Sequence, residues 1–417
     1  MVDKLLIKNI KTLYTSVQKP PVKGKDMGLI EKIENAYIEI EDGYITMVGK
    51  DYDYTTAVFD KVYDASGLIA IPGFVDSHTH LVFGGSREDE FSLKLQGVPY
   101  LDILKQGGGI FNTVKKTKEA SHEELFLQAK KSLDEMLLFG VTTLEAKSGY
   151  GLDLDTEIKQ LEVIKRLDNE HPIDIHSTYL GAHALPKEYE EKREEYIEKI
   201  KHDLEFIAKN NLAEYADVFC EMGVFTAEET KQILLKAKEL GLGLRVHTDE
   251  IESIGGTQVA IELGAKTVDH LMATKASDMA KLAETDIIGN LLPSTSFFLN
   301  KEFAPARQMI EKGMALSISS DYNPGSTPSE NYQFALQLAG NKLRMTPDEI
   351  LTAATINPAY SLGLSDEIGS IEIGKFADIL LLDVKNWDYF IYHYGINHTK
   401  AVFKKGVLVV DNRTILR

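Results

Sequence analysis

The chain contains an apolar run that ends in two histidines, Ile71–His80, with the sequence IPGFVDSHTH. In a β-strand, residues i and i+2 point to the same face, so the imidazoles of His78 and His80 are expected to project the same way. Two neutral imidazoles placed like this suit a divalent transition metal. The His-x-His pattern is short, however, and taken alone it also fits a pair of ordinary, partly buried histidines.

Seven further strand candidates follow this run, and amphipathic stretches separate most of them. The strands are expected at Val141–Ala146, Ile173–Gly181, Tyr215–Cys220, Leu242–His247, Lys266–Leu271, Ile287–Leu292 and Ala315–Ser320. Helical patterns lie between them, for example at Glu123–Phe139, Glu188–Lys209 and Thr226–Leu240. Eight strand–helix units over residues 71–363 predict a (β/α)₈ barrel. A doubly wound sheet is the alternative fold, but such sheets rarely reach eight units without a break.

The two ends of the chain carry shorter, alternating runs that are typical of an antiparallel sheet. They include Ala36–Ile40 before the barrel pattern, and Asp378–Leu382 and Gly406–Val410 after it. Because these runs flank the barrel pattern, residues 1–70 and 364–417 are expected to form one small β-sandwich domain. Residues 71–363 are then expected to form the barrel domain.

The composition excludes several classes of protein. The chain of 417 residues is 43% hydrophobic and carries a formal charge of -18, which would repel nucleic acid and anionic membranes. Its single cysteine, Cys220, rules out an intramolecular disulfide and a metal cluster held only by thiolates. No apolar stretch reaches about 20 residues, and the first residues lack the apolar run of a signal peptide. We therefore expect a soluble, cytoplasmic protein that binds neither nucleic acid nor membranes.

Three more candidate metal ligands lie at the ends of other predicted barrel strands. His247 ends the fifth strand, His270 lies at the end of the sixth, and Asp321 follows the eighth. In a (β/α)₈ barrel these carboxyl ends meet in one mouth, where active sites lie. Singly, His270 could be a hydrogen-bonded core histidine and Asp321 could cap a turn. Together with His78 and His80, these residues predict a metal site, because burying polar groups without a partner in a protein core costs free energy.

This set of ligands resembles the amidohydrolase superfamily, and the segment Gly369–Asp378 is similar to the superfamily's return into its small β domain. The resemblance covers nearly the whole chain. It implies a metal-holding barrel joined to a β-sandwich built from both termini. It also implies that His78, His80, His247 and Asp321 hold one zinc or iron ion per subunit.

The chain departs from two-metal members of the superfamily at the end of the fourth strand. Those members often have a bridging lysine there, whereas this chain reads Val218-Phe219-Cys220-Glu221. The lack of a lysine favours a single metal ion. The alternative is that Glu221 bridges a second ion. Cys220 is expected to be a small buried hydrophobic residue.

A carboxylate, Glu250, follows His247 by three residues and is a candidate proton shuttle. Regular strand geometry would turn it away from the metal, so the chain must turn for Glu250 to enter the mouth. A metal ion lowers the pKa of a bound water toward about 7, and a nearby carboxylate can then carry its proton. His270 and Asp321 would orient that water and hold the proton it loses. The alternative for Glu250 is a helix-start residue favoured by the helix dipole.

The loops after the predicted strands hold the candidate substrate contacts. Arg87, seven residues past His80, can grip a substrate carboxylate in a bidentate fork or pair with its acidic neighbours. The loops resemble those of the branch of the superfamily that opens a carboxylate-bearing ring amide in histidine degradation. That resemblance implies contacts to substrate or product from Arg87, Tyr150, His183, Glu250, Asn323, Gly325 and Ser326.

Two other functions fit parts of the pattern. The spacing of three residues between His247 and Glu250 also suits deaminases and lactamases that act on other heterocycles. Nucleobases, however, lack a carboxylate that Arg87 could bind. A metal-free barrel used as an assembly scaffold would have lost ligands, whereas every ligand position is filled here. We therefore expect a metal-dependent hydrolase of a C–N bond in a cyclic amide, acting on a small molecule with a carboxylate. Likeness to relatives alone implies a homodimer.

Overall fold

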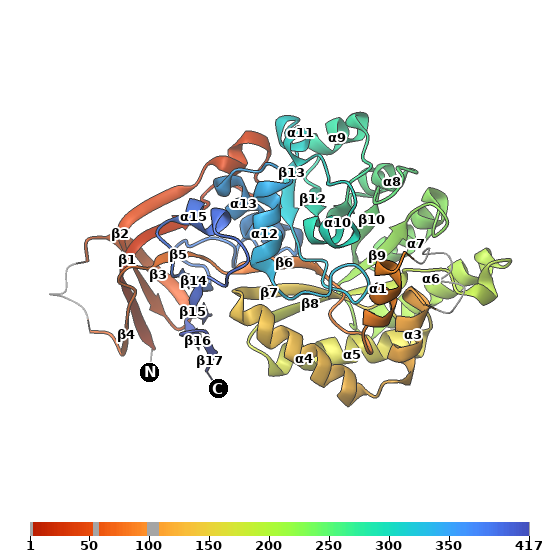
Figure 1. The fold of residues 1–417 in the computed structure, drawn as a ribbon, viewed down its shortest axis with the longest axis horizontal. Helices are drawn as coiled ribbons and strands as arrows, with labels where there is room; N and C mark the ends of the chain where they lie inside the picture. The colour runs from red at the N-terminus through yellow and green to blue at the C-terminus, as the bar shows by residue number, and fades with distance from the viewer. Residues whose placement is uncertain (1–2, 53–57, 98–107, 417) are drawn as a thin grey trace.

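The chain folds into a barrel with a mixed β-sheet beside it, and both termini lie next to that sheet (Figure 1). The computed structural model describes residues 3–52, 58–97 and 108–416. Among these residues, no helix is both long and apolar enough to cross a membrane.

Eight parallel strands form the barrel, in the order in which they occur along the chain. They are β6 (Phe74–Thr79), β7 (Val141–Lys147), β8 (Asp174–Ala182), β9 (Tyr215–Cys220), β10 (Gly243–Thr248), β11 (Thr267–His270), β12 (Ile288–Leu291) and β13 (Ala315–Ile318). Hydrogen bonds between the segments that end the first and last strands close the ring. The amide of His80 donates to the carbonyl of Tyr322 at 2.8 Å, and that of Asp321 to the carbonyl of His78 at 3.1 Å. The predicted (β/α)₈ barrel is confirmed.

Helices connect the strands and cover the outside of the barrel (Figure 1). The helices of the described residues are α1 (Glu88–Leu95), α3 (Ile110–Glu119), α4 (His122–Leu138), α5 (Leu154–Glu170), α6 (Arg193–Lys209), α7 (Ala227–Glu239), α8 (Gly256–Leu263), α9 (Ala276–Ala283), α10 (Pro293–Leu299), α11 (Ala306–Glu311), α12 (Tyr332–Asn341), α13 (Pro347–Ala354), α14 (Ile356–Ser361) and α15 (Trp387–Tyr392), with 3₁₀ turns η1 (Gly24–Gly28) and η2 (Lys187–Tyr189). Of these, α15 and η1 lie in the terminal segments, outside the barrel domain. The helices α4, α7 and α13 each begin at a capping box, in which a Ser or Thr and a Glu three residues later bond to each other's backbone amides. The predicted helix Glu188–Lys209 is too long, because the backbone of Lys192 is not helical (φ -136°, ψ 42°) and α6 begins only after it.

The two ends of the chain build one mixed sheet with a core of its own. Its strands are β1 (Lys4–Thr15), β2 (Glu31–Glu41), β3 (Tyr44–Lys50), β4 (Lys61–Asp64), β5 (Ile69–Pro72), β14 (Ile379–Leu382), β15 (Thr399–Lys404), β16 (Val407–Asp411) and β17 (Thr414–Ile415). The path runs β17-β16-β15-β14-β5-β1-β2-β3, and β4 pairs with β1. Apolar side chains such as Ile7, Ile38 and Leu381 form a cluster separate from the core around the barrel.

The predicted first barrel strand, Ile71–His80, is wrong at its beginning. Residues Ile69–Pro72 form β5, which pairs with β14 and β1 in the terminal sheet, and the barrel strand β6 starts only at Phe74. Both strands are fully buried and read as one apolar run. Because a buried strand shows no alternation, the pattern could not locate the break.

Gly73, at the break between β5 and β6, leaves no room for a side chain. A Cβ atom there would lie 2.2 Å from Oγ1 of Thr142, a buried residue of β7. Gly73→Ala is therefore expected to destabilise the fold by about 1–3 kcal/mol through overpacking, measured as a lower midpoint of urea unfolding. Gly28→Ala is the control, since its nearest neighbour would lie 3.9 Å from the new Cβ. Equal midpoints for the two variants would contradict the expectation.

Candidate active site

The predicted metal ligands come together at the carboxyl end of the barrel. His78 lies in β6, His80 directly after it, and His247 in β10. The Nε2 atoms of His78 and His80 each lie 3.6 Å from Oδ1 of Asp321, and Nε2 of His80 lies 3.4 Å from Nε2 of His247. All four side chains are buried. Four atoms of the kinds that bind metals therefore face one another across the mouth, as do the rings of His247 and His270, whose centroids are 5.3 Å apart.

The buried nitrogens fit a metal ion. Nε2 of His78, which faces the mouth, has no hydrogen-bond partner among the described residues. Such groups cost free energy unless something binds them. Burial lowers the pKa of His78 and His80 well below the ordinary value and that of His270 to about 3, so the rings are neutral at pH 7. Neutral imidazoles with a carboxylate are a donor set that suits zinc and iron.

Asp321 is held by a residue that the sequence did not point to. The backbone of Asp321 is left-handed (φ +55°), a conformation that aspartate adopts more readily than most residues with a side chain. The hydroxyl of Thr295 donates to Oδ2 of Asp321 and lies 3.1 Å from that of Thr327. Thr295 comes from the first turn of α10, a short helix whose pattern predicts no site. The bond leaves Oδ1 facing the histidines.

The turn that Glu250 needs to enter the mouth occurs at Asp249. The backbone there is left-handed (φ +55°), and the hydroxyls of Thr257 and Thr274 donate to Oδ2 of Asp249 at 2.8 and 2.9 Å. The turn brings Oε2 of Glu250 to 3.7 Å from Nε2 of His270. Burial raises the pKa of Glu250 above its ordinary value. A carboxyl that titrates nearer to neutrality is suited to move protons.

Glu221 does not face the mouth as a ligand. One of its carboxylate oxygens accepts from the amides of Met222 at 2.8 Å and Glu252 at 3.1 Å, and the other accepts from the amide of Ile251 at 2.8 Å. Both oxygens therefore hold the loop that carries Glu250. This geometry argues against the alternative in which Glu221 bridges a second metal ion. Cys220 is fully buried, as expected.

Charged residues fill the barrel interior below the histidines, and sequence reasoning missed them. Lys147 lies 2.8 Å from Glu145 and 2.9 Å from Asp217, and all three side chains are fully buried. Oδ2 of Asp269 lies 3.3 Å from Nδ1 of His78, and burial raises the pKa of Asp269 to about 6. The available signal was the presence of charges inside otherwise apolar strands, as in VTTLEAK and YADVFC.

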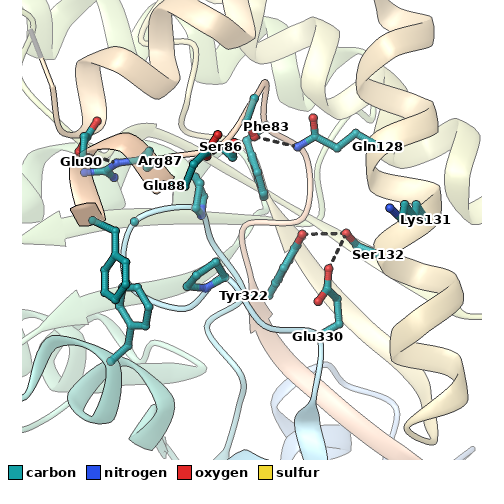
Figure 2. A pocket seen from close by; sticks show the side chains of 16 residues that line it. Phe83, Ser86, Arg87, Glu88, Glu90, Gln128, Lys131, Ser132, Tyr322 and Glu330 are labelled. Atoms are coloured by element: carbon teal, nitrogen blue, oxygen red, sulfur yellow. Dashed lines mark hydrogen bonds and ion pairs between the residues drawn. The ribbon is translucent and has the colours of Figure 1, made fainter. Parts of the chain in front are cut away.

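Arg87 pairs with an acidic neighbour, the second of its two predicted alternatives. Its Nε donates to Oε2 of Glu90 at 3.1 Å, and the side chain is largely buried (Figure 2). Its Nη1 also lies against Gly325, where a Cβ atom would come within 2.3 Å of it. Arg87 is therefore paired with an acidic neighbour and also packed on the loop that follows β13. Glycine at position 325 makes that close approach possible.

Tyr150 and His183 line the mouth beside His80. The ring of His183 stacks on that of His80 with centroids 5.0 Å apart, and Tyr150 lies 5.3 Å from His183. Nδ1 of His183 lies 3.0 Å from the carbonyl of Gly149, which can only accept, so Nε2 is left as an acceptor. Burial lowers the pKa of His183 to about 3. The loop is fixed by Glu157, which accepts from three of its amides and which the sequence did not single out.

Asn323 and Ser326 shape one loop together. The amide of Asn323 donates to the carbonyl of Asp321 at 2.7 Å and to Oγ of Ser326 at 2.8 Å. Its Oδ1 accepts from the backbone of Gly325 and Ser326, each at 2.8 Å. Internal bonds thus occupy the side-chain amide of Asn323, one of the residues expected to contact the substrate. The predicted contacts of these residues with a substrate stay predictions.

A cavity of about 650 Å³ opens next to the mouth, between the loop after β6, helix α4 and the loop after β13 (Figure 2). Arg87, Tyr322 and Gly325 are among its lining residues. On its far side, the hydroxyl of Tyr322 lies 2.7 Å from Oγ of Ser132, which donates to Glu330 at 3.1 Å. Arg87 thus lines this cavity and also packs against the loop that carries Asp321.

Comparisons with solved structures agree with the fold. A zinc-bound adenosine deaminase from Xanthomonas campestris superposes with a TM-score of 0.74 at 18% identity, covering 99% of this chain and 94% of that one. A triazine hydrolase from Arthrobacter aurescens gives 0.73 at 18% identity, covering 99% and 96%. At such low identity these likenesses establish the architecture alone.

Comparisons of sequence go further. The amidohydrolase family matches residues 69–409. An imidazolonepropionase from Streptococcus gordonii is 51% identical over 400 residues, 95% of each chain. One from Bacillus cereus is 49% identical over 408 residues, 97% of this chain and 96% of that one. The chain therefore belongs to the amidohydrolase family and, within it, groups with the imidazolonepropionases.

Proposed function

We propose that this chain is a hydrolase that opens the ring amide of 4-imidazolone-5-propionate to give N-formimidoyl-L-glutamate, a step in histidine degradation. About half of its residues are identical to those of imidazolonepropionases over nearly the whole chain. The structural observation that carries the proposal is the buried cluster in the mouth. There, Glu250 and His270 lie 3.7 Å apart beside the candidate metal ligands.

His78, His80 and His247 through Nε2, and Asp321 through Oδ1, would hold one zinc or iron ion, since these atoms face one another. Such an ion, when bound, lowers the pKa of a water toward about 7 and polarises a carbonyl group. Glu221, just after β9, is poorly placed to bridge a second ion, because both of its oxygens already bond to loop amides.

Glu250 is the proposed proton shuttle. As water adds to the ring carbonyl carbon, its carboxylate takes up a proton. It then delivers that proton to the ring nitrogen while the C–N bond breaks, which leaves a new carboxylate and a formimidoyl group. His270, neutral at pH 7, would donate a hydrogen bond to the carbonyl oxygen as negative charge develops there. Asp321 would orient the water.

Arg87 is the proposed partner of the substrate's propionate. Its Nε is bonded to Glu90, and no other described residue forms a hydrogen bond with its two Nη groups, so these are the groups proposed to form a fork with a carboxylate. Tyr150 and His183, stacked beside His80, would contact the ring. Gly325 and Ser326 would close the site from the loop after β13.

Arg87→Ala is expected to raise KM by about 10–100-fold, because a hydrogen bond to a charged group contributes about 1.5–3 kcal/mol. The value of kcat should change much less, since Arg87 binds the tail and not the reacting atoms. Steady-state kinetics measures both. Arg166→Ala, which removes an arginine paired with Glu123 on the surface, is the control and should leave KM unchanged. An unaltered KM in Arg87→Ala would mean that Arg87 only pairs with its acidic neighbour.

Hydrolysis in water enriched in heavy oxygen tests the proposed bond cleavage. Attack at the ring carbonyl predicts one heavy oxygen in the new carboxylate of N-formimidoyl-L-glutamate, read by mass spectrometry. Attack at the carbon between the two ring nitrogens would instead put the label in an N-formyl group. Finding the N-formyl product would overturn the proposal.

A further inference from the structure

The carboxylate of Asp217 contacts His247 from the interior of the barrel. Asp217 of β9 pairs with Arg245 of β10. Because Arg245 precedes His247 by two residues, Asp217 lies one layer deeper in the barrel than His247. Its Oδ2 lies 2.9 Å from Nδ1 of His247, and its Oδ1 accepts from the backbone amide of His247 at 3.2 Å. The carboxylate therefore contacts both the ring and the main chain of one candidate metal ligand.

Lys147 fixes Asp217 in turn. Its Nζ lies 2.9 Å from Oδ2 of Asp217, the same oxygen that faces His247, and 2.8 Å from Oε1 of Glu145. The three charged side chains are fully buried. Buried charges are costly unless well paired, and removing one partner leaves the other uncompensated. A single buried lysine thus holds the oxygen that faces the ring.

This 2.9 Å contact bears on which nitrogen of His247 can bind a metal. A carboxylate beside Nδ1 favours the proton on that nitrogen and leaves the lone pair on Nε2. Nε2 is the atom that lies 3.4 Å from Nε2 of His80 in the mouth. Asp269 faces Nδ1 of His78 in a similar way, but at 3.3 Å and without contact to the main chain of His78 in the described residues. The contact of Asp217 with His247 is therefore closer than the contact of Asp269 with His78.

We propose that Asp217, held by Lys147, is a positioning residue that fixes the tautomer and orientation of His247 and thereby sets the affinity of the site for its metal ion. The inference rests on the proposed metal site but not on the identity of the substrate. Partners of this kind, one layer beyond a metal's ligands, change metal affinity or activity by about 10–100-fold when they are replaced.

Competition between the full chain and a chelator of known affinity, with zinc as the only added ligand, tests the proposal. Asp217→Asn is expected to weaken zinc binding by about 10–100-fold while the number of ions bound at saturation stays the same. In the cobalt-substituted protein, the visible absorption spectrum should shift, because the ligand field depends on how His247 is oriented. Asp378→Asn is the matched control. It breaks another buried Lys–Asp pair, with Lys404 at 2.5 Å, that belongs to the terminal sheet.

Zinc affinity of Asp217→Asn within about twofold of the unmutated chain would overturn the proposal, and so would an equal loss in Asp378→Asn. If Asp217→Asn does not fold, nitrogen NMR of the histidine rings in the unmutated zinc-loaded chain decides the question. Zinc on Nε2 of His247 with a proton on Nδ1 is expected, and zinc on Nδ1 would overturn it. A chain that fails to open 4-imidazolone-5-propionate but shows these zinc results would refute the proposed function alone.

Discussion

Replacing Glu250 with glutamine is expected to lower kcat for ring opening by about 10²–10⁴-fold while the metal content of the protein stays unchanged. Glutamine keeps the size of the side chain and its place 3.7 Å from His270, but it cannot take up and release a proton. Rates should be measured with saturating 4-imidazolone-5-propionate, and metal content by elemental analysis of the same samples. Glu252→Gln, an exposed glutamate two residues along the same loop, should leave both quantities unchanged.

The pH profile of the same variant gives a second readout. Glu250 works as a base only when it is ionised, so kcat/KM of the unmutated chain should fall as pH drops through the pKa of Glu250. Burial raises that pKa, so the acid limb should lie above the ordinary range of a glutamate. Glu250→Gln should lose the limb altogether. A variant that kept both its rate and the limb would assign the proton transfer to another group.

Replacing Asp321 with asparagine is expected to weaken metal binding by at least about 100-fold and to lower turnover by about 10³-fold or more at limiting metal. The variant removes the negative charge from the oxygen that lies 3.6 Å from Nε2 of both His78 and His80. It also replaces the acceptor of the bond from Thr295. Metal affinity and turnover should fall together, because one residue supports both.

A buried aspartate away from the mouth is the control for Asp321→Asn. Asp203 in α6 is nearly fully buried and pairs with Lys199 at 2.5 Å, so Asp203→Asn also removes a buried charge. This control is expected to lower stability but to leave metal affinity unchanged. If Asp321→Asn binds metal as tightly as the unmutated chain, Asp321 is not a ligand.

The residues predicted from sequence are those whose chemistry and position both carry a signal. Histidine is costly at buried strand ends unless it has a partner, and the barrel brings the ends of distant strands together, so the residues alone could group His78, His80, His247, His270 and Asp321. The narrower set of four ligands, without His270, came from the resemblance to the superfamily. The required turn before Glu250 followed from strand geometry in the same way. The structure shows where it occurs, at Asp249.

The residues that sequence reasoning missed act through main-chain contacts or through a second buried layer. Asp217 and Lys147 sit in strands buried on both faces, where a period of two does not tell the inside of the barrel from the outside. Glu157 and Glu221 each accept from several loop amides, and no pattern of side chains reports which backbone groups need a partner. The break between β5 and β6 was hidden for a related reason, since both strands are fully buried.

Metal titration of the stripped protein tests whether one metal ion per chain drives ring opening. Turnover of 4-imidazolone-5-propionate should be absent without metal. It should rise in proportion to added zinc or iron and level off at one ion per chain, with N-formimidoyl-L-glutamate as the product. Full turnover by the metal-free chain, or a plateau reached only at two ions per chain, would contradict the account.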